Sequence, residues 1–496
     1  MKHCLLFSVL IGYYCLLFSQ APIPTPISVF EGKNYSSNFG YSLTGNGDLN
    51  GDGFLDLAVG APIYNFGDPG SGAVFVYYGN ALGIDTTADI AFFGDQYDCR
   101  LGQAVAINGD INNDGYDDLV YSASDYDIPL GYASGRVFIH YGSQSGVSAL
   151  PSVMLDAYQV GSQFGYNLNY AGDVNGDGFT DLAIAASTYD NGNTDEGRVY
   201  VYHGSALGLN VIPIITYESN STLGYMGIAL ASAGDVNGDG YDDLMMTASG
   251  VDAGEFNEGR VYIYHGSSVG LSATPAITFD GNVSYSAFGN SLAGAGDLNN
   301  DGFDDILISQ NAYSGAFEYE GRVFIYYGSD AGITPIGGSV IYGNKNSAHC
   351  GTAISYVANY NNDEFDDVLI SGDSYSNGEY HEGRSAVYLG SASGILSEPA
   401  VTFEINQIEA HLGRNSSRLG DINYDGFDDI AINASSYDNE FVNEGAVIIY
   451  YGSDCIATKY FADSDEDGFG STLDYIVSCS PVPGFILDSL DCVDSI

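Results

Sequence analysis

Residues 48–56 read Asp48-Leu49-Asn50-Gly51-Asp52-Gly53-Phe54-Leu55-Asp56, and this acidic stretch decides the fold because the chain repeats it seven times. Successive copies start 62 or 63 residues apart, at Asp48, Asp110, Asp173, Asp235, Asp297, Asn359 and Asp421. A constant period of this size is typical of one supersecondary unit repeated along the chain. The spacing therefore predicts a repeat architecture before any local pattern is considered.

The residue types within each loop predict a bound ion. Asp at positions 1, 5 and 9 and Asn at position 3 are hard oxygen donors, and Gly at position 6 allows a sharp turn. We predict one calcium ion per loop. The sixth loop departs from the pattern, with Asn359 at position 1 and Glu364 in the Gly slot, so we expect that site to be weak or empty.

Positions 1, 3, 5, 7 and 9 make up each predicted calcium site. They are Asp48, Asn50, Asp52, Phe54, Asp56; Asp110, Asn112, Asp114, Tyr116, Asp118; Asp173, Asn175, Asp177, Phe179, Asp181; Asp235, Asn237, Asp239, Tyr241, Asp243; Asp297, Asn299, Asp301, Phe303, Asp305; Asn359, Asn361, Asp363, Phe365, Asp367; and Asp421, Asn423, Asp425, Phe427, Asp429.

Four strand-like runs recur in the same register around each loop. An apolar-Gly pair such as Phe39-Gly40 comes nine residues before the loop, and a second apolar run follows the loop. Further runs resemble Gly197–Tyr202 and Pro275–Asp280, rich in β-branched and aromatic residues. No helical periodicity is found beyond the N-terminus. The sequence therefore predicts an all-β fold, a seven-bladed β-propeller of four-stranded antiparallel blades.

The two ends of the array predict a closed ring. The last repeat stops after its third strand, Gly445–Gly452, while Pro26–Gly32 resembles the fourth strands of other repeats. We expect the N-terminal strand to complete the last blade and so remove an exposed sheet edge.

These motifs resemble the FG-GAP repeats of integrin α subunits and of many bacterial surface proteins, over residues 27–453. Phe39-Gly40 and Gly60-Ala61-Pro62 supply the two halves of that name. The resemblance implies an adhesion or ligand-binding module whose ligands meet the face away from the calcium loops. Candidate recognition segments join the second and third strands: Ile63–Ser71, Thr188–Glu196, Gly250–Glu258, Asn311–Glu320, Asp373–Glu382 and Ser436–Glu444.

The chain ends predict an extracellular protein. Residues 1–20 read as a secretory signal peptide, and no later segment could span a bilayer. Residues 455–496 resemble the aspartate-rich calcium modules related to thrombospondin type 3 repeats, with Asp463, Asp465 and Asp467 as predicted ligands. A disulfide is expected among Cys455, Cys479 and Cys492, whereas Cys350 is expected to be a buried thiol. This module is either a spacer before a further part or the end of the protein.

The formal charge of −52, from 64 acidic and 12 basic residues, excludes nucleic acid and anionic membranes as simple electrostatic partners. Adaptation to a saline setting and binding of an ion-rich polysaccharide both remain open as its explanation. Five cations recur at one repeat position, which predicts structural ion pairs between strands: Arg136, Arg198, Arg260, Arg322 and Arg384.

No histidine lies in a recognisable nucleophile or zinc motif, so no catalytic residue is predicted. His140, His203 and His265 replace strand residues and are expected in the core or on blade faces, while His349, His381 and His411 look scattered. The favoured interpretation is a secreted or cell-surface, monomeric calcium-binding propeller with an unknown extracellular protein or polysaccharide partner. Two alternatives are a calcium-dependent polysaccharide lyase or hydrolase and a structural surface-layer component.

Overall fold

The computed structural model describes residues 26–129, 131–157, 159–334 and 338–453, and the strands at 458–462, 471–478 and 485–486. Two compact units are present, of which the larger spans Pro24–Asp454. The predicted signal peptide and most of residues 455–496 lie outside the described residues, including Asp463, Asp465, Asp467 and the three C-terminal cysteines.

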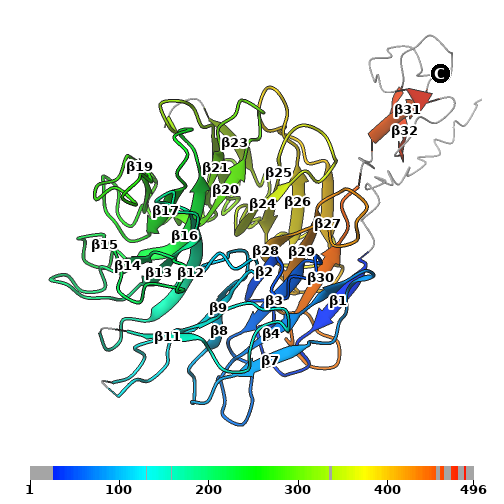
Figure 1. Cartoon of the computed structure of the whole chain (residues 1–496). Helices are drawn as coiled ribbons and strands as arrows, with labels where there is room; N and C mark the ends of the chain where they lie inside the picture. Colours follow the sequence, from blue (N-terminus) through cyan, green and yellow to red (C-terminus); the bar gives the residue numbers. More distant parts are fainter. Residues whose placement is uncertain are drawn as a thin grey trace, which may run out of the picture. The chain divides into compact units, whose positions relative to one another are not determined.

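The larger unit is a seven-bladed β-propeller, as predicted (Figure 1). Each blade is a four-stranded antiparallel sheet, and no helix occurs in the described part of the chain. In blade order the strands are β2 (Ser42–Gly47), β3 (Asp56–Ala61), β4 (Ala73–Tyr77), β7 (Ile90–Phe93); β8 (Leu101–Ala106), β9 (Leu119–Ala123), β10 (Arg136–His140), β11 (Val153–Asp156); β12 (Phe164–Gly172), β13 (Asp181–Ala186), β14 (Arg198–Tyr202), β15 (Ile215–Glu218); β16 (Met226–Gly234), β17 (Asp243–Ala248), β18 (Arg260–Tyr264), β19 (Ile277–Asp280); β20 (Phe288–Gly296), β21 (Asp305–Gln310), β22 (Arg322–Tyr326), β23 (Ser339–Tyr342); β24 (Ala353–Ala358), β25 (Asp367–Gly372), β26 (Arg384–Tyr388), β27 (Val401–Glu404); and β28 (Leu412–Gly420), β29 (Asp429–Ala434), β30 (Ala446–Tyr450), β1 (Ser28–Glu31).

The short strands β5 (Gly79–Asn80) and β6 (Gly83–Ile84) pair with each other in the first blade's outer connection. In the smaller unit, β31 (Thr458–Ala462) pairs with β32 (Ser471–Ser478) and with β33 (Phe485–Ile486).

The N-terminal strand closes the ring, which confirms the sequence prediction. β1 pairs antiparallel with β30, in a register that places Ser28 opposite Ile449 and Glu31 opposite Ala446. Phe30 of β1 is buried in a core cluster shared with β3 and β28 residues such as Leu57 and Leu419. The strand thus supplies both backbone hydrogen bonds and apolar contact where the last blade meets the first.

The core lies between neighbouring blades. The cluster between the third and fourth blades, for example, joins Val199 and Val201 of β14 to Leu230 of β16 and Met246 of β17. Successive side chains of a strand point to opposite faces of its sheet, so each blade presents apolar side chains to the blade on either side. The glycine that precedes each third strand allows close approach to the next blade: at Gly197, with φ +74°, an added Cβ would lie 2.2 Å from the amide nitrogen of Met226.

Strand-to-strand ion pairs tie the outer edge of the blades, as predicted from the repeated arginines. Arg136 binds Asp156 at 2.5 Å and Arg260 binds Asp280 at 2.5 Å, in each case across the third and fourth strands. Arg198–Glu218 and Arg384–Glu404 are equivalent pairs. The fifth blade differs: Arg322 faces Tyr342 in the register and its Nε donates to Gln310 at 2.7 Å.

Candidate metal loops and ligand face

The acidic loops all lie at one end of the blades, between the first and second strands. In the third blade, Asp173 directly follows β12, and Asp181, at position 9, is the first residue of β13. Because the blades are antiparallel meanders, the connections between second and third strands lie at the opposite end. The propeller therefore has a loop face, formed by the seven acidic loops, and an opposite face.

Side-chain acceptors wind each loop into a tight turn. Asp173 Oδ1 accepts from the N–H of Gly176 at 2.7 Å and of Asp177 at 3.1 Å, and its Oδ2 accepts from Gly178 N at 2.8 Å. Asn175 Oδ1 accepts from Asp177 N at 2.8 Å. Gly178 has φ +86°, a conformation that favours glycine. These bonds fix positions 1, 3 and 5 on the inside of the turn.

The position-9 aspartates are fully buried and join the loop to the third strand. Asp181 Oδ1 accepts from Gly204 N at 3.0 Å, and the same bond recurs in all seven blades. Burial raises the pKa of Asp56, Asp118 and Asp181 to about 8, with nearby loop carboxylates adding to the shift. The corresponding pKa is raised to about 7 for Asp243, Asp305, Asp367 and Asp429.

A cation suits this donor set. Carboxylates at positions 1, 5 and 9 and the Asn oxygen at position 3 are oxygen ligands of the kind that calcium takes. A carboxylate has about four lone-pair sites, so the loop hydrogen bonds leave it further acceptor capacity. In the fourth loop Asp243 Oδ2 is buried without a hydrogen bond, 3.9 Å from His265 Nε2. No group of three acidic, His or Cys side chains is already arranged around one point in the described residues.

The sixth loop has a different hydrogen-bond pattern. The Asn359 amide Nδ2 donates to the carbonyl of Asp363 at 2.5 Å, and its Oδ1 accepts from Asp363 N at 2.8 Å. The Asn amide at position 1 has one acceptor oxygen and an NH2 group that can only donate, whereas the Asp173 carboxylate offers two acceptor oxygens. The structure thus gives a physical basis for the expectation that this loop is the weakest site.

Position 8 was missed by the sequence reading and links neighbouring loops. Asp242 Oδ2 accepts from the N–H of Asp173, at position 1 of the preceding loop, at 2.7 Å, and Asp304 does the same for Asp235. Asp117, Asp366 and Asp428 make equivalent contacts in their blades. The repeated Asp-Asp pair at the end of the motif is the only sequence signal of this role.

Three histidines that looked scattered in the sequence gather on the opposite face, which corrects that interpretation. The rings of His381 and His411 have centroids 5.7 Å apart, and His411 Nδ1 lies 3.1 Å from the carbonyl oxygen of Asp373. Like-charged neighbours His411 and His349 add to the burial that lowers the pKa of His381. The ring curvature, which brings successive blades together, was not readable from the spacing of these residues.

Of the three histidines expected in the core or on blade faces, His140 lies as predicted, whereas His203 and His265 directly follow β14 and β18 at the loop face. His140 is buried, its Nε2 lies 2.9 Å from the Tyr121 hydroxyl, and burial lowers its pKa to about 4. His203 and His265 are half-buried beside the position-9 aspartates. Cys350 is a buried free thiol, also as predicted, and burial raises its pKa to about 12.

One segment matches the Gly-x-Ser-x-Gly pattern of hydrolase nucleophiles, at Gly266–Gly270. It is the turn after β18, where Ser267 Oγ donates to the Gly270 carbonyl at 2.7 Å. Ser205 makes the same bond in the third blade, at 2.7 Å. The serine at the nucleophile position of the pattern is Ser268, next to Ser267. A nucleophile elbow joins a strand to a helix, whereas this turn lies between β18 and β19, so the match is a turn of the blade.

The FG-GAP repeat family model matches residues 39–77, 169–202, 226–264 and 288–326. Four blades of this propeller are FG-GAP repeats. The matched segments fall in the first, third, fourth and fifth blades, and the other three blades have the same four-stranded topology.

Integrin α chains are homologous to these FG-GAP repeats. Integrin alpha-PS5 of Drosophila melanogaster is 36% identical over 167 residues, 32% of this chain and 16% of the relative. Integrin alpha-5 of Xenopus laevis is 28% identical over 248 residues, which are 48% of this chain and 22% of the relative. A phosphatidylinositol-glycan-specific phospholipase D of Rattus norvegicus is 35% identical over 214 residues, which are 39% of this chain and 25% of the relative. The chain thus matches a quarter or less of the length of each of these relatives.

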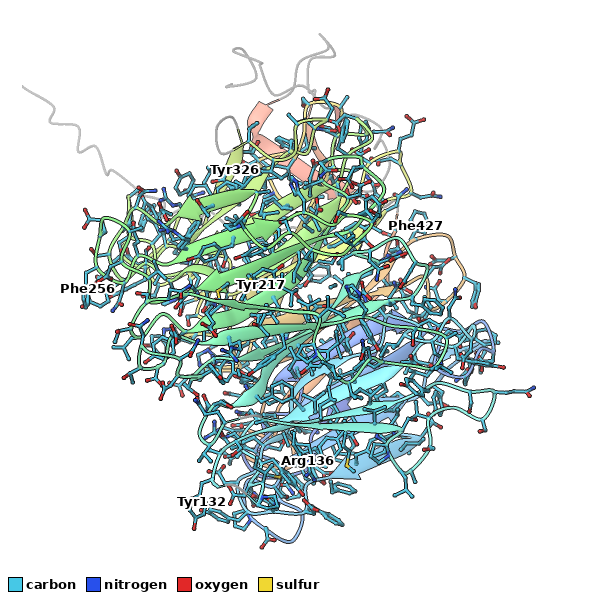
Figure 2. All side chains as sticks on the ribbon, turned by 60° about the vertical axis from the view of Figure 1, so that its left-hand side comes forward. Tyr132, Arg136, Tyr217, Phe256, Tyr326 and Phe427 are labelled. Carbon is cyan, nitrogen blue, oxygen red and sulfur yellow. The ribbon has the colours of Figure 1, made fainter. Side chains whose placement is uncertain are left out.

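The connections on the opposite face are held by buried glutamates. Glu258 Oε1 accepts from Ala253 N at 2.7 Å and Glu255 N at 3.1 Å, and Glu444 Oε1 accepts from Asn439 N at 2.9 Å. These connections, which include the candidate recognition segments and the second-blade connection that carries Tyr132, expose large apolar side chains. Figure 2 shows two of them projecting outward, Tyr132 and Phe256; the set is Phe66, Tyr132, Phe256, Phe317, Tyr319, Tyr380 and Val442. None of the described segments forms a helix long and apolar enough to span a membrane.

Proposed function

We propose that this protein is a secreted or cell-surface calcium-binding propeller that acts as an adhesion or ligand-binding module. The single observation that carries the proposal is the division of the molecule into two faces. Acidic loops occupy one face, and firmly anchored segments with exposed aromatic tips occupy the other. Tyr132 is 81% exposed and Tyr380 is 59% exposed, although the burial of an aromatic side chain away from water is favourable. Exposed aromatic groups that recur on one face are typical of binding surfaces.

Calcium has a structural role in this proposal. The carboxylates at positions 1, 5 and 9 of a loop carry up to three like charges at short range, and a bound divalent cation offsets their repulsion. The position-9 aspartate would pass this effect to the third strand through its bond to the following glycine N–H, as from Asp181 to Gly204. Calcium therefore stabilises the blades, and the opposite face binds the ligand.

The test measures metal and ligand separately. Elemental analysis of the purified protein should find about six calcium ions, because the Asn359 loop is weakened, and chelation should lower the melting temperature by mass action. Binding to extracellular proteins and polysaccharides should weaken in a Phe256→Ala, Tyr380→Ala double variant that melts like the wild type. Absence of calcium together with an unchanged melting curve in EGTA would contradict the proposal.

A polysaccharide lyase or hydrolase is a second candidate, and one observation favours it. His349, His381 and His411 lie near Asp373 on the opposite face, so groups that can transfer protons are gathered there. Incubation with polysaccharides and measurement of chain cleavage separates this candidate from the binding module. Cleavage that disappears in His381→Gln would favour the enzyme.

A further inference from the structure

A polar channel runs along the propeller axis. The first strands of the seven blades surround it, and two adjoining cavities of about 560 and 620 Å³ share Leu43, Val105, Leu168 and Asn415 as lining residues. The larger cavity lies at the end away from the acidic loops, where the first strands begin. We call this end the channel mouth, defined by the residue after each apolar-Gly pair: Tyr41, Gln103, Tyr166, Ile228, Asn290, Thr352 and Arg414.

The channel mouth has no carboxylate in its ring of seven, although the protein has 64 acidic residues. Phenol, amide, hydroxyl and guanidinium groups make up most of the ring. Gln103 Nε2 donates to the Tyr41 hydroxyl at 3.3 Å, so neighbouring blades already form a hydrogen-bonded edge there. The lining therefore offers donors and acceptors with little net charge.

A fixed acceptor lies beside an open donor on one side of the mouth. Asp373 is 7% exposed and accepts from Thr352 Oγ1 at 3.2 Å, and from Arg414 Nη1 at 3.4 Å. The Arg414 side chain is 50% exposed, and within the described residues Asp373 is its one ion-pair partner, although a guanidinium has five N–H donors. Asn290, in the blade before that of Thr352, is also exposed. Donors and acceptors are thus presented together on a rigid rim.

We propose that the channel mouth binds the end of a neutral oligosaccharide. Sugar hydroxyls both donate and accept, which suits the amides of Gln103 and Asn290 and the Asp373–Arg414 pair. Tyr41 and Tyr166 provide aromatic surface for the apolar faces of a sugar ring. The cavity volume is within the range of small-ligand sites, roughly 300–1,000 Å³.

Net charge selects against acidic ligands. A protein with formal charge −52 repels polyanions at distances up to a Debye length, about 8 Å at physiological ionic strength. A single exposed arginine at the mouth does not reverse that field. The assignment rests on the proposed ligand-binding role and names the ligand class for a site distinct from the aromatic tips.

The experiment uses the full chain in saturating calcium on an array of neutral gluco-, manno- and galacto-oligosaccharides and their uronate counterparts. We expect retention of at least one neutral series and none of its uronate form. Asn290→Ala and Arg414→Ala should each weaken that binding by about five- to tenfold, because each removes a hydrogen bond. One control should bind like the wild type: Lys33→Ala, which removes an exposed positive charge elsewhere. Phe256→Ala is measured beside it to test whether the oligosaccharide lies on the aromatic tips instead.

Retention of no neutral oligosaccharide, or of the uronate series alone, would overturn the assignment. So would binding that is lost in Phe256→Ala and kept in Asn290→Ala, because the ligand would then lie on the tips. Melting curves of every variant show whether each is folded. Calcium content is measured on the same samples, so failure at the mouth with normal calcium leaves the proposed metal-binding function standing.

Discussion

Two aspartates of the fifth loop should respond differently to chelation, because only one of them is part of the protein interior. Asp305, at position 9, is fully buried, and its oxygens accept from Gly328 N at 2.8 Å and Leu298 N at 3.0 Å. Asp305→Ala leaves both N–H groups buried without acceptors, at about 1–3 kcal/mol each. The free energy of unfolding should therefore fall by about 2–6 kcal/mol even without metal.

Asp301, at position 5, is the matched comparison. Its side chain is exposed, and Oδ1 accepts one N–H, from Phe303 at 3.2 Å. Water can replace that bond, so Asp301→Ala should cost less than about 1 kcal/mol in the absence of metal. In calcium the same substitution removes a ligand and should lower the melting temperature. The two variants should thus differ most clearly in chelator.

The assay is thermal unfolding followed by circular dichroism, in calcium and in excess EDTA. For a propeller of roughly 430 residues the entropy of unfolding is about 0.9 kcal/mol per kelvin. Asp305→Ala should then melt about 2–7 °C below the wild type in EDTA, and Asp301→Ala within about 1 °C of it. Equal melting temperatures for the two variants in EDTA would refute the division of roles between positions 5 and 9.

Three further results are expected. Deletion of Pro26–Gly32 exposes the edge of β30, and size-exclusion chromatography should show self-association; a stable monomer would indicate that β1 is dispensable. Asp177→Ala should lower the melting temperature in calcium more than Asp363→Ala, and the two should converge in EGTA; equal losses in calcium would make the sixth loop a full site. Urea unfolding of metal-free protein should show stability falling from about pH 5 to about pH 8. The sign follows because the folded pKa of Asp181, raised to about 8, exceeds its unfolded value, so ionisation opposes folding; a flat profile would contradict it.

The propeller could be predicted because its information is local and repeated. The loop motif, the four strand-like runs and their offsets recur every 62 or 63 residues, and each blade is one such unit. Closure was also predictable, since Pro26–Gly32 has the pattern of a fourth strand without a blade of its own. The same argument identified the arginine pairs, whose partners follow from the register between third and fourth strands.

Contacts between blades could not be predicted from the sequence pattern. Asp242 reaches the N–H of Asp173 because adjacent loops are brought together by the ring, and 69 residues separate them in the chain. The gathering of His381 and His411, and the channel mouth around Tyr41 and Arg414, arise in the same way. A period identifies which residues are equivalent, but the blade-to-blade angle decides which of them touch. The predicted metal ligands stay predictions, supported by donor chemistry and by the burial of position 9.

The two faces are connected by the first strand of each blade, and this limits how calcium can affect ligand binding. In β12, Tyr166 lies at the channel mouth and Asp173 follows the other end of the strand, roughly 23 Å away for seven extended residues. An ion in the loop is therefore too far to contact a ligand at the mouth. Its influence must pass through blade stability, and the five position-8 aspartates connect neighbouring loops at five of the seven junctions. Loss of one ion should then lower stability without abolishing binding, whereas loss of all should loosen every blade that lines the mouth.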